Sequence, residues 1–187
     1  VIFGLVTYAT KGVSFGAIEP TIPNMIIPKL NGFPTIIIWA VAAIAIVWFI
    51  WNKTTFGKNL YAVGGNPEAA AVSGISVFGV TVGAFILAGI LYGFGSWLEC
   101  ARMVGSGSAA YGQGWEMDAI AACVVGGVSF TGGIGKISGV VVGVMIFTAL
   151  TYSLTILGID TNLQFVFEGI IIIAAVTLDC LKYVQKK

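Results

Sequence analysis

The sequence predicts an all-α protein, a polytopic bundle of transmembrane helices that includes one short helix, broken or re-entrant. Composition is the first reason, since 58% of the 187 residues are hydrophobic, only 9% are charged, and the mean hydropathy is +1.00. A soluble domain carries about 25% charged residues, so this chain lacks the polar side chains that a water-facing surface needs. The second reason is that several uncharged apolar runs are long enough to cross a bilayer.

Composition also excludes several function classes. The net charge of +1 argues against nucleic acid as a partner, and the absence of histidine removes the commonest metal ligand and acid–base group. Cys100, Cys123 and Cys180 are scattered and form no CxxC pair, so we interpret them as apolar filler. We therefore predict no catalytic residue, no metal site and no cofactor, and we do not expect an enzyme.

The first part of the chain gives the weakest signals. Val1–Thr10 is apolar but short, and no basic stretch precedes it as in a signal peptide. We expect it to be the tail of a helix whose beginning is missing, and the sequence to be a fragment of a longer chain. Lys11–Phe33 is rich in glycine and proline, so we expect a loop that lies outside the hydrocarbon or is buried in protein.

Four apolar runs have the length of a complete span, which requires about 20 residues with a range of about 17–25. They are residues 34–51, 77–97, 137–157 and 165–181. A fifth run, Ala119–Phe130, is shorter and has glycine-rich flanks. Such a segment fits a broken or re-entrant helix better than a full crossing.

The longest polar interruption is residues 53–76, KTTFGKNLYAVGGNPEAAAVSGIS, which lies between the first two full spans. Gly64-Gly65 is expected to break the backbone, and one helix of about two turns is expected to follow it. A short helix on a membrane face has few apolar residues of its own to bury. It is therefore well shaped for docking into a groove of another protein.

Local chemistry predicts both ends of that short helix. Asn66 can cap it, and Pro67 suits its first position, where the missing N–H costs nothing. Glu68 follows in the first turn, where the helix dipole favours an anion. The alanines at 69–71 are strong helix formers, and Gly74 can end the helix.

The basic residues predict an orientation in the membrane. If the spans alternate and the short segment 119–130 changes side, six basic residues fall on one side and three on the other. The six are Lys53, Lys58, Lys136, Lys182, Lys186 and Lys187, and the three are Lys11, Lys29 and Arg102. This bias places the segment 53–76 and the C-terminus in the cytoplasm.

Glycine patterns suggest close packing of helices. Four pairs are spaced four residues apart: Gly79/Gly83, Gly89/Gly93, Gly135/Gly139 and Gly139/Gly143. We favour packing within the chain, and a seam between two copies is the alternative. The run Gly132–Lys136 lacks the Ser or Thr and the spacing of a phosphate-binding loop, so it predicts a tight turn between two membrane helices.

A few charged and polar residues lie near membrane depth. Glu116 and Asp118 precede the short segment, where they suit a helix N-terminus, or else line the outer vestibule of a translocation path together with Ser129. Glu168 is expected at the membrane interface without a partner. Glu99 and Arg102 are three residues apart and are expected to form an ion pair at a helix end.

Three stretches closely resemble the permease subunits of bacterial ABC sugar importers of the ribose/xylose/galactose branch, above all those of the galactose/methyl-galactoside type. They are GKNLYAVGGNPEAAAVSGI (57–75), MDAIAACVVGGVSFTGGIG (117–135) and EGIIIIAAVTLDCLKYVQKK (168–187). Glu68-Ala69-Ala70 with Gly74 also resembles the EAA loop of other ABC importer permeases. The hydrophobic–Pro ending of that longer motif is absent here.

The resemblance implies that residues 1–187 are the C-terminal part of one permease domain in the bacterial inner (plasma) membrane. It implies that residues 53–76 hold a coupling helix seated in a separate ATP-binding subunit. The implied contacts are Gly64, Gly65, Asn66, Pro67, Glu68, Ala69, Ala70, Ser73 and Gly74. It also implies a periplasmic sugar-binding protein, a second permease copy and membrane lipid as partners.

Two other function classes remain open. An ion-coupled secondary transporter or channel would bind its ion or substrate at the broken helix and would need polar groups there. The segment 119–130 offers only Ser129 for that purpose. A structural membrane anchor for a partner complex is the third class, and it would leave the two glycine-rich regions without a purpose.

Overall fold

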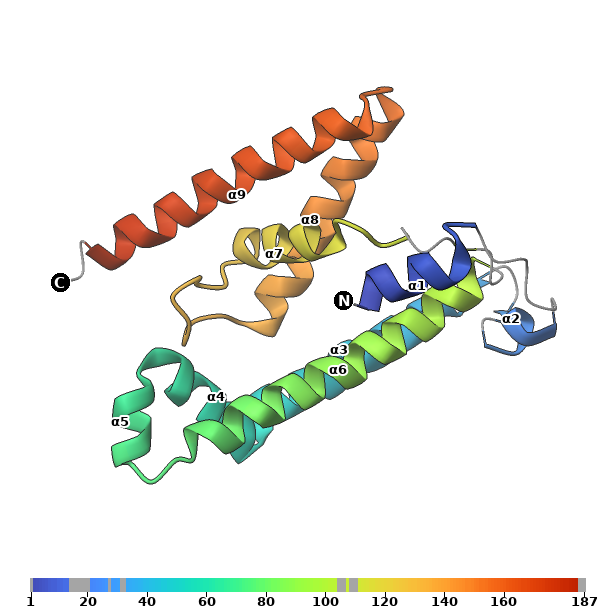
Figure 1. The fold of residues 1–187 in the computed structure, drawn as a ribbon. Coiled ribbons are helices and arrows are strands. Elements are labelled where there is room, and N and C mark those ends of the chain that lie inside the picture. The colour runs from blue at the N-terminus through green and yellow to red at the C-terminus, as the bar shows by residue number, and fades with distance from the viewer. Residues whose placement is uncertain are drawn as a thin grey trace. The chain divides into compact units, whose positions relative to one another are not determined.

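A computed structural model describes residues 2–13, 21–26, 28–30, 33–103, 107 and 111–184. The described chain is helical apart from its turns and two strands of two residues each, so the predicted all-α class is confirmed (Figure 1). The helices are α1 (Ile2–Thr10), α2 (Thr21–Ile26), α3 (Ile36–Lys53), α4 (Thr55–Gly65), α5 (Pro67–Val72), α6 (Val77–Arg102), α7 (Trp115–Val125), α8 (Ile137–Ile156) and α9 (Thr161–Val184). Strands β1 (Lys29–Leu30) and β2 (Phe33–Pro34) pair antiparallel.

The predicted apolar runs coincide with helices. Helices α3, α6 and α8 are long and apolar enough to cross a bilayer. Helix α6 continues beyond its apolar run to Arg102, and α9 extends at both ends beyond the predicted 165–181. Hydropathy identifies only the apolar part of a helix. The polar turns at the ends continue the same backbone hydrogen bonding, but they lie outside the apolar pattern.

The chain forms two compact units. Val1–Ile46 and Thr81–Gln113 make the first unit. In it, Trp39 of α3 meets Phe94 and Trp97 of α6 edge-on, with ring centroids 6.1 Å apart in both pairs. Such aromatic pairs stabilise a helix contact beyond the area that they bury.

The expectation of a plain loop over Lys11–Phe33 is corrected within this unit. The described part of that stretch contains α2 and β1, and β1 pairs with β2 through Leu30 and Phe33. Helix α2 tolerates Pro23 because this proline stands in the first turn, where its missing N–H has no partner to lose. A six-residue helix that contains a proline is too short to show a hydrophobic periodicity, so the sequence pattern did not predict it.

The second unit comprises Val47–Val80 and Gly114–Lys187. Its core lies where α7 packs against α8 and α9 (Figure 1). Ala121, Ala122 and Phe147 are buried there, and Ile172 of α9 packs against them. The small alanines let the short helix α7 approach both longer helices closely.

Helix α7 begins at Trp115, four residues before the predicted run Ala119–Phe130. It ends at Val125, before that run ends. Gly114, at φ +94°, accepts hydrogen bonds from the N–H groups of Met117 and Asp118 and starts the helix. At the other end Gly127 takes a φ of +82°, and the Val128 N–H bonds the Cys123 carbonyl at 3.0 Å. This left-handed cap stops the helix, so the rest of the predicted run forms a turn.

Glycines make the α7–α8 contact possible. A Cβ on Gly143 would lie 2.2 Å from the Ala122 carbonyl oxygen, and one on Gly139 would lie 2.3 Å from the Gly126 oxygen. The Gly139/Gly143 pair therefore packs within the chain, as the favoured interpretation predicts. Gly89 and Gly93 of α6 have nothing of this kind within 4 Å, so a seam between two copies stays a prediction.

Gly143→Ala is expected to destabilise the permease that contains this chain by about 1–3 kcal/mol, because the added methyl group forces α7 and α8 apart. The matched control is Val144→Ala at the next position of α8, which is exposed in the structure. The thermal unfolding midpoint of the purified full-length permease measures the effect. Equal midpoints for the two variants would contradict the close approach of α7 and α8.

Candidate functional site

Helix α4 leaves the end of α3 at a sharp corner. Thr54 alone separates the two helices; its hydroxyl donates to the Ile50 carbonyl at 2.6 Å and accepts from the Gly57 N–H at 3.2 Å. Gly57 is buried in the corner, and a Cβ on it would lie 2.1 Å from the Trp51 carbonyl oxygen. Only glycine fits here, so the corner holds α4 in a defined direction relative to the end of α3.

The predicted break at Gly64-Gly65 is wrong. Both glycines belong to the last turn of α4, an 11-residue helix that sequence reasoning missed. The helix ends one residue later, where Asn66 takes an extended conformation (φ −156°, ψ 103°). Pro67 is the physical cause, since the residue before proline is disfavoured in the helical region. Thr54, which can cap a helix, was the signal available in the sequence.

Helix α5 has the ends that the sequence predicts. The Asn66 side chain accepts a hydrogen bond from the Ala69 N–H at 3.0 Å, and Pro67 occupies the first turn. Gly74 takes a φ of +81°, and the Ile75 N–H bonds the Ala70 carbonyl at 3.0 Å, which closes the last turn. Caps at both ends stabilise a six-residue helix that is too short to persist alone.

Most of the predicted docking residues are exposed. Gly65, Asn66, Pro67, Glu68, Ala69, Ser73 and Gly74 are exposed, Gly64 is half-buried, and Ala70 is buried at 4% exposure. Because α5 packs on α4, we assign Ala70 to that contact rather than to the outer face. Val72 was not predicted as a docking residue, yet its side chain is 91% exposed. A bulky apolar residue inside a polar segment was the signal that could have identified it.

Helix α4 rests against the connection between α7 and α8. A Cβ on Gly64 would lie 2.8 Å from the Gly133 nitrogen, and one on Gly133 would lie 2.6 Å from the Gly65 Cα. The Tyr61 hydroxyl donates a hydrogen bond to the Gly135 carbonyl at 2.7 Å. The connection contains a tight turn, but it lies at Ser129–Gly132, where the Gly132 N–H bonds the Ser129 carbonyl at 3.3 Å, and not over the predicted Gly132–Lys136. Glycines on both sides allow backbone to touch backbone.

This contact bears on the predicted orientation. Lys136 follows the turn that touches α4, so it belongs to the same end of this unit as Lys53 and Lys58. The lysine count required the short segment to change side so that these three residues fall together. The contact supports that arrangement, and the cytoplasmic placement of residues 53–76 stays a prediction.

A cleft of about 410 Å³ lies beside the contact between α4 and the α7–α8 connection. Lys136 is the one charged residue among those that line it. The lining residues are Tyr61, Gly126, Gly127, Gly133, Ile134, Gly135, Lys136, Ser138 and Gly139. Five of these nine residues are glycines, so backbone atoms form much of the lining. Such a cleft can admit a side chain of a partner protein, but it offers few groups that could catalyse a reaction.

The predicted path residues are not brought together. Glu116 is exposed in the first turn of α7, with Asp118 half-buried in the same turn. Ser129 lies in the turn beyond the other end of α7, where its N–H bonds the Ile134 carbonyl at 3.0 Å and its hydroxyl pairs with Thr131 at 2.8 Å. The helix between them is about 16 Å long. A joint role for these residues in a path stays a prediction.

The interfacial position expected for Glu168 is wrong. This side chain is buried at 4% exposure where α9 meets α7, and Asp118 of α7 is its ionisable neighbour there. The partner comes from a helix far away in the sequence, which explains why no sequence pattern indicated it.

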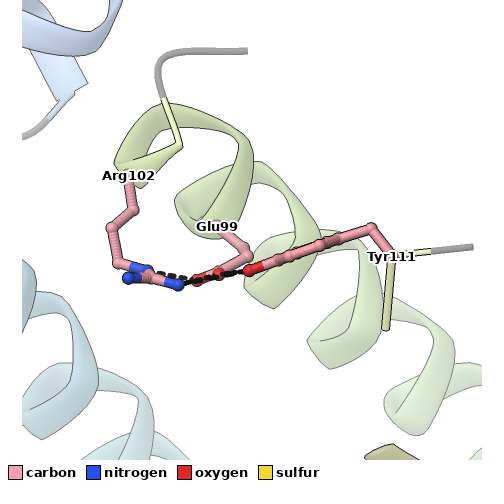
Figure 2. A network of polar contacts seen from close by, with 3 residues as sticks. All are labelled: Glu99, Arg102 and Tyr111. Atoms are coloured by element: carbon pink, nitrogen blue, oxygen red, sulfur yellow. Dashed lines mark hydrogen bonds and ion pairs between the residues drawn. The ribbon is translucent and has the colours of Figure 1, made fainter. Parts of the chain in front are cut away.

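The predicted pair of Glu99 and Arg102 is confirmed and includes a third residue. Arg102 Nε donates to Glu99 Oε2 at 2.8 Å, and Arg102 Nη2 contacts Glu99 Oε1 (Figure 2). The Tyr111 hydroxyl donates to the same carboxylate and accepts from Arg102 at 3.2 Å. The hydrogen bond to Glu99 raises the pKa of Tyr111 above its ordinary value. The network holds Tyr111 on the last turn of α6.

Comparisons with known proteins agree with the resemblance. The profile of a family described as branched-chain amino acid transport system / permease component matches residues 1–176. The galactose/methyl galactoside import permease protein of Treponema pallidum is 57% identical over 196 residues, which cover 100% of this chain and 36% of that protein. The protein of that name from Escherichia coli is 53% identical, with 80% of this chain and 44% of that protein covered.

A ribose import permease protein is also similar. The one from Bacillus subtilis is 42% identical over 148 residues, which cover 79% of this chain and 46% of that protein. This chain thus spans less than half the length of these relatives. No solved structure matches it.

Proposed function

Because the chain belongs to the family of transport-system permease components whose profile matches residues 1–176, we propose that it forms part of the permease of an ATP-driven sugar importer. Four relatives named as galactose/methyl galactoside import permeases are 52–57% identical to it, which supports a sugar of that type as the substrate. The apolar helices α3, α6 and α8 fit a multi-pass protein of the bacterial inner membrane. The permease itself carries out no covalent chemistry.

The proposed transporter has four kinds of partner. A separate ATP-binding subunit binds and hydrolyses ATP, and a periplasmic sugar-binding protein delivers the sugar. A second copy of the permease and the surrounding lipid complete the assembly. ATP binding moves the docking segment, and the helices then open their path alternately to the two sides of the membrane.

The observation that carries the docking proposal is the surface of α5. Val72 is 91% exposed on a segment whose other exposed residues are small or polar. A groove of the ATP-binding subunit that covers this side chain would remove its apolar surface from water, which favours docking. Glu68 lies in the first turn of the same helix, where it can meet a basic or amide group of the ATP-binding subunit.

Two contacts can transmit a movement of α5 into the membrane helices. Helix α5 packs on α4 through the side that contains Ala70. Helix α4 touches the α7–α8 connection through Gly64 and Gly133, and Tyr61 adds a hydrogen bond at Gly135. Displacement of α5 by the ATP-binding subunit would therefore shift α7 and α8 rather than only a surface loop.

Reconstituted uptake tests the proposed function. The full-length permease, its ATP-binding subunit and the sugar-binding protein are placed in liposomes, and uptake of labelled galactose is measured. We expect uptake that requires ATP on the side of the ATP-binding subunit and that ionophores do not reduce. Uptake without ATP, driven by an imposed ion gradient, would contradict the proposal and favour the ion-coupled alternative.

A further inference from the structure

Two carboxyl groups meet inside the second unit, where α7 packs on α9. Glu168 is 4% exposed and Asp118 is half-buried, and the two carboxyl groups are neighbours in this contact. Glu168 Oε2 and Asp118 Oδ1 are buried and have no hydrogen-bond partner among the residues that the structure describes. A buried carboxylate oxygen without a partner is costly, and a proton shared between the two groups removes much of that cost.

The pair adjoins the apolar core of this unit. Asp118 stands one turn before Ala122, and Glu168 stands one turn before Ile172, and both of these residues belong to the core of this unit. Residues one turn apart lie on the same helix face. The two carboxyl groups are therefore on the faces of α7 and α9 that pack against the core, and not on a water-facing side. Electrostatic interactions between groups in such a place are strong.

The neighbouring helices offer no positive charge. Helices α7 and α8 contain no lysine or arginine, and Lys182 of α9 lies more than three turns beyond Glu168. Of the other titratable side chains on α7 and α8, Glu116 and Tyr152 are exposed and Cys123 is a half-buried thiol. Asp118 is therefore the ionisable group that faces Glu168, and both carry negative charge when ionised.

We propose that Asp118 and Glu168 form a proton-binding pair, which shares one proton and joins α7 to α9 through a hydrogen bond. Two carboxylates side by side in an apolar place cannot both ionise at low cost, and a shared proton removes the repulsion. Glu168 is the more deeply buried of the two carboxyl groups, so its charge is the costlier one. The proton therefore resides on Glu168, and its loss to water as the pH rises leaves two anions that push α7 away from α9.

Infrared spectroscopy of the purified full-length permease tests this proton directly. A protonated carboxyl group has a carbonyl stretch that is separate from both carboxylate bands. We expect this band at neutral pH in the wild type and in Glu116→Gln, the control on the exposed position of the same helix turn. We expect Glu168→Gln to lack the band, because its amide replaces the protonated group.

Stability against pH is the second measurement, since it separates a proton site from simple packing. The folded chain keeps a proton that an ordinary glutamate loses at about pH 4.3, so the unfolding midpoint of the wild type is expected to fall as the pH rises from about 5 until this proton is lost. Glu168→Gln should lack this fall, because its amide keeps donating to Asp118. Absence of the band in the wild type would mean that a cation from another part of the permease pairs with the two carboxylates, which overturns the proposal. An unchanged band in Glu168→Gln, or parallel pH profiles, would also overturn it.

Discussion

Val72→Glu is expected to abolish co-purification of the ATP-binding subunit with the full-length permease and to abolish sugar-stimulated ATP hydrolysis. The side chain is 91% exposed, so a charge there costs the permease fold little. In a docked complex the same charge would be buried without a partner, which costs about 3–5 kcal/mol. An affinity loss of about a hundredfold or more follows from that free energy.

The control for this variant is Thr55→Glu, which adds the same charge at the exposed first residue of α4. An acidic residue at a helix N-terminus is favourable, so this variant should keep both activities. Ala70→Glu would not serve as this test, because Ala70 is buried and the new charge would disrupt α5 itself. Wild-type binding in Val72→Glu, or equal loss in Thr55→Glu, would contradict docking through α5.

Gly64→Ala is expected to uncouple ATP hydrolysis from sugar transport. Its Cβ would lie 2.8 Å from the Gly133 nitrogen, so α4 must move away from the α7–α8 connection. Overpacking of this kind costs about 1–3 kcal/mol. We expect the variant to keep its ATP-binding subunit, because α5 is unchanged, but to lose sugar uptake per ATP hydrolysed.

Gly65→Ala is the matched control, since it adds the same methyl group one position along the same helix turn. Nothing lies within 4 Å of its Cβ, and alanine favours a helix over glycine by about 0.5–1 kcal/mol. The ratio of sugar transported to ATP hydrolysed, measured in liposomes, should fall in Gly64→Ala only. Equal ratios in the two variants would contradict transmission through the α4 contact.

The features that the sequence predicted are those that local chemistry determines. Asn66, Pro67 and Gly74 act on their own backbone neighbours, so both ends of α5 could be located without any structure. The apolar runs predicted the long helices for the same reason, because the length and the hydropathy of a segment depend on that segment alone. The error at Gly64-Gly65 arose because glycine was interpreted as a break, whereas Pro67 ends α4.

The features that the sequence did not predict depend on segments far apart in the chain. Tyr61 and Gly135, Gly64 and Gly133, and Asp118 and Glu168 are each brought together by packing of helices. Periodicity and capping rules describe one element at a time and give no information on such pairs. Glu168 therefore looked isolated in the sequence, although its partner lies on α7.

Photo-cross-linking from position 72 tests the docking of α5 most directly. A photoreactive amino acid replaces Val72 in the full-length permease, which is assembled with its ATP-binding subunit and sugar-binding protein and then irradiated. A second probe replaces Phe78, which is exposed near the start of the apolar helix α6. The account predicts an adduct with the ATP-binding subunit from position 72 and lipid adducts from position 78. An adduct from position 72 with lipid or with the periplasmic protein, and none with the ATP-binding subunit, would contradict it.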